Sequence, residues 1–392
     1  MISFEDAMKA ILSDVRPIGT EKTGLYESLD RVLAEDVYSD IDMPPFNKAA
    51  VDGYACRKED IHKELEVLEL IAAGEIPTKK ITEGKCTKIM TGAMVPEGAE
   101  VILMVEHTES LPGNKIRFIK EKSSPNIAYK AEDVKTGDLI WSKGMLIKPQ
   151  HIATFAAVGC SDPLVAKKPR VAIMSTGDEL VEPTEKPGPG KIRNSNAYQL
   201  IAQTIAMGCT PNYIGIIPDS EKATDFAIKK ALAENDLVVL TGGVSMGDFD
   251  FVPKIMKENK VDIIFQKVAI KPGRPTVFGR TEKSYIFGLP GNPVSSFINF
   301  EIFAKPLLYK MMGHNYKEMG MKMHLDNDFK RKTFDRLEFI PVEIDASSGR
   351  VRPVEYHGSA HIHAICLAHG LMVIPKGTAE IKKGELVDVR PF

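Results

Sequence analysis

The stretch Leu237-Val-Val-Leu-Thr-Gly-Gly243 is a short apolar run followed directly by two glycines. This pattern is typical of a buried strand that ends in a tight turn. Similar apolar runs occur at 171–174, 213–217, 263–270 and 285–288. Segments with helical spacing of apolar residues lie between them, at 196–207, 223–232 and 251–258. Strands that alternate with crossover helices predict a mostly parallel sheet covered on both faces.

The sequence on either side of this α/β segment has a different texture. Residues 4–12 have a helical stripe, a second helical stretch is expected at 25–33, and Pro44 and Pro45 then break regular structure. Short alternating runs follow at 65–71, 86–90, 101–106 and 115–119. Comparable runs return near the C-terminus, at 339–344, 371–374 and 386–390. The sequence therefore predicts a multidomain protein in which β-rich modules flank a central α/β sheet.

Composition excludes several classes of protein. The 392 residues, enough for two to four domains, carry 51 Lys and Arg against 53 Asp and Glu, a net charge of −2. This balance gives no support for nucleic acid or a membrane surface as a partner. No apolar stretch approaches the roughly 18 residues that would span a bilayer. The N-terminal residues resemble no signal sequence, and we expect a cytoplasmic protein.

The cysteines and histidines give no clear metal or disulfide pattern. Five cysteines are widely spaced and form no C-x-x-C pair, so most are expected to be buried as small apolar residues. His361 and His363 would share one face of a strand, with His357 and His369 nearby. A metal site is one interpretation, and a polar turn is the favoured one because no third ligand stands at a firm spacing.

Polar residues follow the predicted strands at the points where they end. Thr176 and Glu179 follow the first strand, Asp219 the second, and Gly242, Gly243, Ser245 and Asp250 the third. Ligands of open α/β sheets bind beyond the carboxyl ends of the strands. Glycines there let a ligand approach the main-chain amides closely.

The turn after the strand at 285–288 reads Pro290-Gly-Asn292-Pro293. Asn292 is placed as an N-cap and Pro293 as the first residue of a helix that runs to about 312. The free amides of this turn, with the Ser295 hydroxyl, would favour an oxyanion. The alternative is that glycine-containing turns follow strands in every α/β fold.

Positive charge is concentrated at 267–274. Pro272 argues against a helix, so Lys267 and Lys271 are expected on one face of a strand, with Arg274 in the turn after it. The two lysines could clamp an oxyanion or could form a solvated sheet edge. Carboxylates on the same rim would repel a polyphosphate unless they bind Mg²⁺ or accept hydrogen bonds from the ligand. The pattern favours a metal-assisted enzyme of nucleotides or phosphoesters.

Five motifs, in order, resemble one family. They are Met43-Pro-Pro-Phe-Asn-Lys-Ala-Ala-Val-Asp52-Gly-Tyr-Ala, Ile89-Met-Thr91-Gly-Ala, Ser175-Thr-Gly-Asp-Glu179-Leu, Thr241-Gly-Gly-Val-Ser-Met-Gly-Asp-Phe-Asp250, and Lys271-Pro-Gly-Arg-Pro with Leu289-Pro-Gly-Asn-Pro-Val-Ser. The sequence resembles the MoeA family of molybdopterin molybdenumtransferases, which includes the E domain of gephyrin. The resemblance covers essentially the whole chain.

This resemblance implies a particular architecture. A bipartite stalk, at about 1–45 and 140–167, would be interrupted by a β-rich domain at about 46–139. An α/β domain similar to molybdopterin adenylyltransferases would follow at 168–314, and a small C-terminal β-barrel at 315–392. The family forms homodimers, and its site lies between the α/β domain of one protomer and the β-rich domain of the other. Implied further partners are a molybdopterin adenylyltransferase and molybdoenzyme targets.

The resemblance also implies an activity, the insertion of molybdate into adenylylated molybdopterin with Mg²⁺-dependent release of AMP. The positions that match the family's functional residues are Asp52, Thr91, Asp133, Glu179, Asp219, Asp250, Lys267, Lys271, Pro290 and Pro293. Molybdate would be held by the lysines, by Arg274 and by groups near Ser245 and Ser295. Asp219 and Asp250 would orient Mg²⁺ or water, and Asp52 and Thr91 would act across the dimer.

Two alternatives remain beside this reading. Tungstate is nearly isosteric with molybdate, and the sequence does not separate them. A peptide-binding scaffold of the same fold is a second alternative, but every matched carboxylate and lysine is present, which favours the enzyme. The sequence departs from the family pattern in Asn47-Lys-Ala-Ala-Val51 and in the histidine-rich stretch at 357–363.

Overall fold

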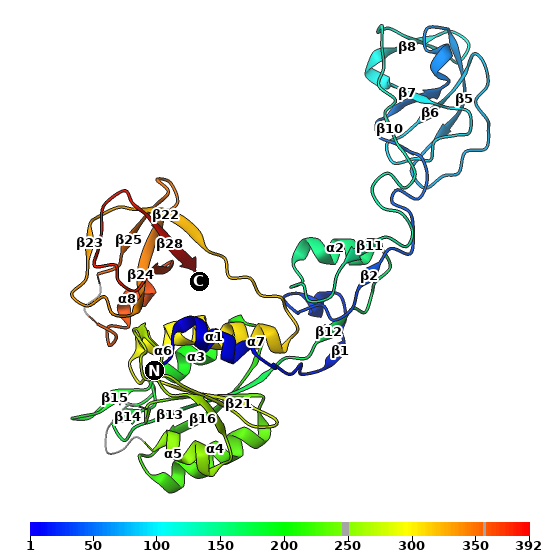
Figure 1. The fold of residues 1–392 in the computed structure, drawn as a ribbon. Helices are drawn as coiled ribbons and strands as arrows, with labels where there is room; N and C mark the ends of the chain where they lie inside the picture. The colour runs from blue at the N-terminus through cyan, green and yellow to red at the C-terminus, as the bar shows by residue number, and fades with distance from the viewer. Residues whose placement is uncertain (245–250, 356–357) are drawn as a thin grey trace.

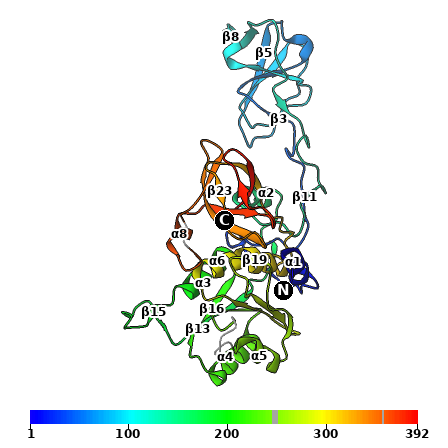
Figure 2. The ribbon, with the colours of Figure 1, turned by 60° about the vertical axis from the view of Figure 1, so that its left-hand side comes forward.

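The computed structural model describes residues 1–244, 251–355 and 358–392 and is strongly elongated (Figure 1). A β-rich domain, in blue and cyan, stands at one end of a narrow connection. The α/β domain and the C-terminal β domain lie at the other end, and the same separation is visible in a view turned by 60° (Figure 2). No helix within the described ranges has the length and apolar character needed to cross a membrane.

The narrow connection is built from two stretches of chain that run side by side. Its strands pair β1 (Thr20–Lys22) with β12 (Leu164–Ala166) and β2 (Val37–Tyr38) with β11 (Leu139–Trp141), and α2 (Pro149–Ala157) packs beside them. The prediction of a helix at 25–33 is wrong, because only a 3₁₀ turn at Tyr26–Ser28 forms there. The backbone beyond it pairs instead, with Val32 opposite Leu146 and Leu33 opposite Val165.

The β-rich domain has a six-stranded sheet in the order β7-β4-β6-β5-β9-β8. Its strands are β4 (Gly53–Cys56), β5 (Leu65–Ile71), β6 (Lys85–Ile89), β7 (Val101–Met104), β8 (Thr108–Leu111) and β9 (Lys115–Phe118). A separate pair joins β3 (Lys48–Ala49) to β10 (Ile127–Ala128). The predicted β-rich module is confirmed, although the run predicted at 101–106 ends in a 3₁₀ turn at Val105–His107.

The α/β domain has a six-stranded sheet in the order β16-β13-β17-β21-β20-β18. The first four strands are parallel: β16 (Thr210–Ile217), β13 (Arg170–Thr176), β17 (Leu237–Thr241) and β21 (Tyr285–Leu289). Next, β20 (Val277–Arg280) pairs antiparallel with β21, and β18 (Asp262–Phe265) pairs antiparallel with β20. The predicted, mostly parallel sheet is confirmed.

Helices cover both faces of this sheet (Figure 1). One face carries α3 (Ser195–Ala206) and α6 (Pro293–Asn299), with α1 (Phe4–Leu12) and α7 (Lys305–Met311) beyond them; the other carries α4 (Glu221–Glu234) and α5 (Val252–Glu258). Along β17, Leu237 and Val239 join the first core and Val238 and Leu240 the second. Successive strand residues point to opposite faces, which is why an unbroken apolar run is needed here.

One expectation for this region needs correction, and a second is confirmed with an added detail. The single strand predicted at 263–270 is wrong: β18 ends at Phe265, and β19 (Ile270–Lys271) pairs with a strand of the C-terminal domain. Between them the backbone of Val268 pairs with Ile2, so the chain turns away from the first sheet. The helix after Asn292 does continue to Met311, but residues Phe300–Ala304 form a π-helical segment between α6 and α7.

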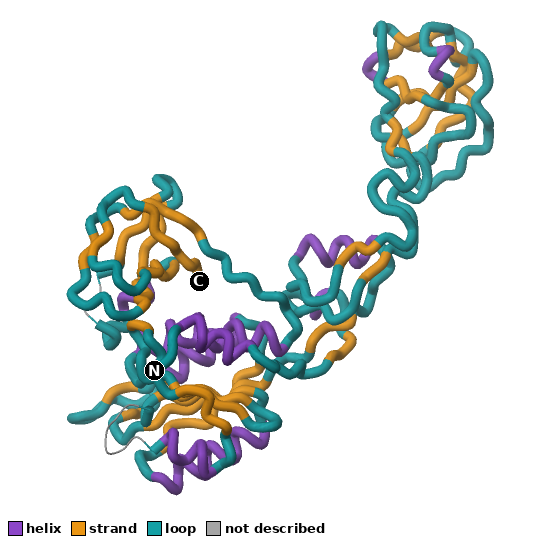
Figure 3. The backbone as a smooth tube through the Cα atoms, viewed as in Figure 1, coloured by secondary structure: helices purple, strands orange, loops and turns teal. Residues whose placement is uncertain are grey.

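The C-terminal domain is a small closed β-barrel (Figure 3). Its strands are β22 (Met321–Leu325), β24 (Leu337–Asp345), β25 (Arg350–Pro353), β26 (Gly370–Ile374) and β28 (Leu386–Pro391), and the pairing of β24 with β26 closes the barrel. A smaller pair, β23 (Phe329–Lys330) with β27 (Glu380–Ile381), and the short helix α8 (His363–Cys366) complete the domain. The predicted C-terminal barrel is confirmed.

Candidate functional site

A cavity of about 220 Å³ lies at the carboxyl ends of β13 and β17. Thr176 ends β13, Gly242 follows β17, and Asn292 and Pro293 begin α6 after β21. All four border the cavity together with Glu179. The carboxyl ends of neighbouring parallel strands meet at one edge of a sheet, which brings these five predicted residues together.

Gly242 is the first residue after β17 and has a backbone conformation that favours glycine. Its φ is +91°, and a Cβ atom there would lie 2.6 Å from both the carbonyl oxygen and the Oγ1 of Thr176. Gly243 follows with a φ of +65°. The turn therefore brings the main chain directly against the end of β13 and leaves the cavity open beside it.

We expect Gly242→Ala to destabilise the α/β domain by about 2–4 kcal/mol, because it adds a steric clash to an unfavourable φ. Gly190→Ala is the matched control: its φ is +72°, but a Cβ atom there meets nothing within 4 Å, so only the backbone cost of about 1 kcal/mol remains. Urea denaturation of both variants measures the difference. Equal losses at the two positions would show that the contact with Thr176 contributes nothing.

The predicted carboxylates occupy different positions around the strand ends. Glu179 is exposed and its carboxylate lies against Gly177, where a Cβ atom would be 2.4 Å from Oε2. Asp219 follows β16 and does not border the cavity; its Oδ2 accepts a hydrogen bond from the Asp178 amide at 3.3 Å, and its own amide donates to Asp178 Oδ1 at 3.2 Å. The other predicted residues of this rim, Asp250 and Ser245, lie outside the described residues.

A loop of the C-terminal domain covers part of the cavity rim. Asn292 Nδ2 donates to Ser359 Oγ at 2.8 Å, the Val294 amide donates to the Ser359 carbonyl at 3.1 Å, and Ala360 borders the cavity. Ser359 belongs to the histidine-rich stretch at 357–363 but is not among the residues predicted for the site. His361 and His363 are exposed, His357 is not among the described residues, and the described part of the chain holds no cluster of three or more His, Cys, Asp or Glu side chains suited to a metal.

Two asparagines at the start of α3 were also missed. Asn194 accepts hydrogen bonds from Ser175 Oγ at 2.9 Å and from the Ala197 amide at 3.3 Å, so it caps the helix and fixes the end of β13. Asn196 Nδ2 donates to the Gly291 carbonyl at 2.6 Å. The sequence Asn194-Ser-Asn196 before a helical segment was the available signal, because asparagine is a preferred N-cap.

The predicted cationic segment does not border this cavity. Lys271 lies on β19, and its Nζ is 2.8 Å from Oε1 of Glu338 in the C-terminal barrel. The Lys267 carbonyl accepts a hydrogen bond from Ile2 at 3.1 Å, and Arg274 is exposed in the following turn. Pro290 and Ser295, which were also predicted, are buried beside the start of α6.

Asp52 and Thr91 meet in the β-rich domain, which Figure 1 shows at the far end of the same chain from β13. Asp52 Oδ1 accepts hydrogen bonds from the Thr91 hydroxyl at 2.6 Å and from its amide at 2.7 Å. These bonds lower the pKa of Asp52 below its ordinary value. Asp133 is exposed in the connection below the domain, where its amide donates to the Met43 carbonyl at 3.1 Å.

Thr91→Val is expected to raise the pKa of Asp52 toward its ordinary value, because the hydroxyl donor is lost while the amide donor remains. Since the folded-state pKa is lowered, the stabilisation from this pair is present above about pH 4 and is lost as the pH falls through the folded pKa. A carboxyl-detected NMR titration measures the shift. Thr136→Val is the control: Thr136 makes the same two bonds to Asp42, so only the pKa of Asp42 should rise.

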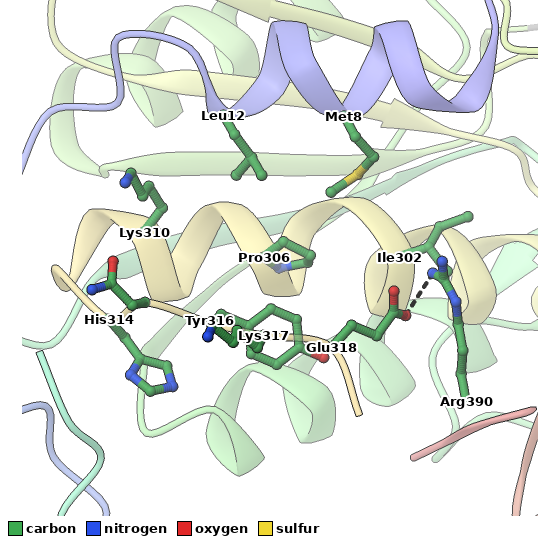
Figure 4. Close-up of a pocket in the computed structure, with 11 residues that line it drawn as sticks. Met8, Leu12, Ile302, Pro306, Lys310, His314, Tyr316, Lys317, Glu318 and Arg390 are labelled. Atoms are coloured by element: carbon green, nitrogen blue, oxygen red, sulfur yellow. Dashed lines mark ion pairs between the residues drawn. The ribbon is translucent and has the colours of Figure 1, made fainter. Parts of the chain in front are cut away.

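A second cavity, of about 460 Å³, lies between α1, α7 and the chain that enters the C-terminal barrel (Figure 4). Met8 and Leu12 of α1 face Pro306 of α7 across it. Arg390 pairs with Glu318 at 2.6 Å on its polar side, where burial raises the pKa of Glu318. This cavity shares no residue with the one at the strand ends.

Comparison with protein families divides the chain into three matched regions. Residues 2–159 match the MoeA N-terminal region (domain I and II), residues 172–310 a probable molybdopterin binding domain, and residues 323–392 the MoeA C-terminal region (domain IV). The chain is 37% identical to the molybdopterin molybdenumtransferase of Staphylococcus epidermidis, over 99% of this chain and 95% of the relative. It is 33% identical to that of Bacillus subtilis, over 99% and 93%.

The fold agrees with solved structures over the full length. A molybdopterin biosynthesis moeA protein of Pyrococcus horikoshii matches with a TM-score of 0.87 and 34% identity, and the match covers all of both chains. A molybdenum cofactor biosynthesis protein of Pyrococcus furiosus, 22% identical with a TM-score of 0.64, shares the fold.

Proposed function

This chain belongs to the MoeA family and is a transferase enzyme of molybdenum cofactor biosynthesis; from that premise we propose that it inserts molybdate into adenylylated molybdopterin, with Mg²⁺-dependent release of AMP. The observation that carries the proposal is the cavity at the strand ends, where Thr176, Glu179 and Gly242 converge. Because the Gly242 amide donates to the Leu289 carbonyl and the Val294 amide to the Ser359 carbonyl, oxyanions of the substrate would be bound by side chains that border the cavity, such as Arg193.

Distinct groups of this chain would serve the two anionic parts of the reaction. Lys271 carries a positive charge close to the junction with the C-terminal barrel, and we propose that it binds the molybdate oxyanion. Mg²⁺, when bound, would neutralise charge on the phosphate that leaves with AMP. The oxygen donors of Asp219, with Asp178 beside it, fit this hard cation, which prefers one or two carboxylates together with phosphate oxygens.

We further propose that the enzyme is a homodimer and that its site is completed by the partner subunit. The β-rich domain, which holds Asp52 and Thr91, is separated by the narrow connection from β13, whose last residue borders the cavity (Figure 1). Large apolar side chains lie exposed on α3 and on the connection: Tyr198 is 44% exposed, Ile205 58% and Tyr26 86%. We propose that these exposed side chains contribute to the dimer interface.

The remaining proposals concern the cellular setting. A molybdopterin adenylyltransferase would supply the substrate, molybdoenzymes would receive the product, and the enzyme would act in the cytoplasm. The first two follow from the chemistry of an adenylylated substrate and a finished cofactor.

The test supplies purified protein with adenylylated molybdopterin, Mg²⁺ and either molybdate or tungstate, and follows the release of AMP. We expect release that depends on both the oxyanion and Mg²⁺. Release with tungstate alone would indicate a tungstate-inserting enzyme. If neither oxyanion supports release by folded protein, the proposed insertion reaction with AMP release is wrong.

A further inference from the structure

Glu338 is a buried carboxylate that joins a partly exposed lysine to a buried arginine. Its Oε1 lies 2.8 Å from Lys271 Nζ, and its Oε2 lies 3.1 Å from Arg331 Nη1. The side chains of Glu338 and Arg331 are 4% and 3% exposed, whereas that of Lys271 is 42% exposed. Buried charges persist only where each is paired, and Glu338 and Arg331 pair with each other.

The network of Lys271, Glu338 and Arg331 carries a net positive charge. Two cations face one carboxylate, which leaves a net positive charge. Arg331 is fixed by further hydrogen bonds to the carbonyls of Arg336, Pro375 and Thr378, so it is tied to the barrel. An ammonium has three donors and Glu338 takes one of them. The surplus charge and the remaining donors therefore belong to the exposed end of the network, at Lys271.

The backbone holds the same lysine in place. β19 pairs with β24 so that Lys271 lies opposite Glu338 and Ile270 opposite Leu337. Arg336 Nη1 donates to the Ile270 carbonyl at 3.2 Å. Although Lys271 comes from the α/β part of the sequence, the C-terminal barrel controls both its main chain and its side chain.

We propose that Glu338 is a positioning residue, which holds the Lys271 ammonium in the orientation that binds a tetrahedral dianion of the molybdate class. Glu338 does not contact the anion itself, because like charges repel. This inference rests on the proposed function, in which Lys271 binds molybdate.

Calorimetric titration with sodium molybdate tests this role, because a positioning role and a purely electrostatic role predict opposite changes in molybdate affinity when Glu338 is replaced. Replacing Glu338 with glutamine makes the network more positive, so a purely electrostatic role predicts tighter molybdate binding. Loss of positioning predicts weaker binding, and we expect Glu338→Gln to weaken it by about tenfold or more. Glu338→Asp keeps the charge but shortens the side chain, and we expect an intermediate loss.

Glu343→Gln is the matched control, because Glu343 lies on the same strand and pairs with Arg352 at the surface. We expect wild-type affinity for this variant. If Glu338→Gln binds molybdate as tightly as the control, or more tightly, the positioning role is wrong, and it is equally wrong if folded wild-type protein binds no molybdate. Should Glu338→Gln not fold, as judged by circular dichroism, Glu338→Asp decides between the same outcomes. AMP release by the wild-type protein, measured separately, decides the proposed transfer reaction.

Discussion

Two inactive variants, Asp52→Asn and Glu179→Gln, are expected to restore each other's activity when they are coexpressed. Asp52 lies in the β-rich domain and Glu179 borders the cavity at the end of β13, and Figure 1 shows that domain and β13 at opposite ends of the molecule. In a mixed dimer with shared sites, one site carries both substitutions and the other carries neither. Half of the dimers are mixed, so molybdate-dependent AMP release should return to about a quarter of the wild-type value.

The control pairs Glu179→Gln with Lys271→Ala, two changes in the part of the chain at the same end of the molecule. In each mixed dimer, one site then carries Glu179→Gln and the other carries Lys271→Ala, so no activity should return. Recovery by neither pair would contradict a site shared between protomers. Recovery by both pairs would show that the β-rich domain is not what one protomer contributes to the site of the other.

The Lys271→Ala enzyme is expected to lose turnover by about 10²–10³-fold, the usual effect of removing one group that stabilises an oxyanion. The protein should still fold and form dimers, because Glu338 remains paired with Arg331 at 3.1 Å after the lysine is removed. AMP release gives the rate, and thermal unfolding with size-exclusion chromatography gives stability and assembly.

Lys330→Ala serves as the control for this variant. Lys330 pairs with Glu380 at 3.1 Å on the surface of the same barrel and is 68% exposed, and surface pairs contribute about 0–1 kcal/mol. Its turnover should equal that of the wild type. Unfolding of the Lys271→Ala protein, rather than loss of turnover in a folded dimer, would make Lys271 a structural residue.

The elements that the sequence predicted correctly are those whose pattern is local. The apolar run of β17 and the glycines after it indicate a buried strand and a tight turn without any knowledge of their neighbours. The stretch at 25–33 was misread because its spacing suits a helix in isolation, but its backbone pairs with strands more than a hundred residues away in sequence. Long-range pairing overrides weak helical preference.

The candidate site likewise contains residues that a local pattern predicted and residues that it did not. Thr176, Glu179, Gly242, Asn292 and Pro293 were expected together because parallel strands end at one edge, and they border one cavity. The sequence predicts Lys267 and Lys271 on one face of a strand near the same rim, but only Ile270 and Lys271 form a strand there, β19. The chain leaves the α/β sheet after β18, and Glu338, the partner of Lys271, lies in another domain, so no local pattern joins them. The functional roles of these residues stay predictions.

By itself, the sequence determined which segments are strands of a parallel sheet and which turns carry glycine and carboxylate, because side-chain alternation and backbone freedom are properties of neighbouring residues. Only the tertiary structure decided which distant side chains meet: Asp52 with Thr91, Asn292 with Ser359, and Lys271 with Glu338. Such pairs depend on which strands lie side by side in a sheet and on how domains pack. Those arrangements come from the burial of whole surfaces, to which each residue contributes too little to be recognised in its own stretch of sequence.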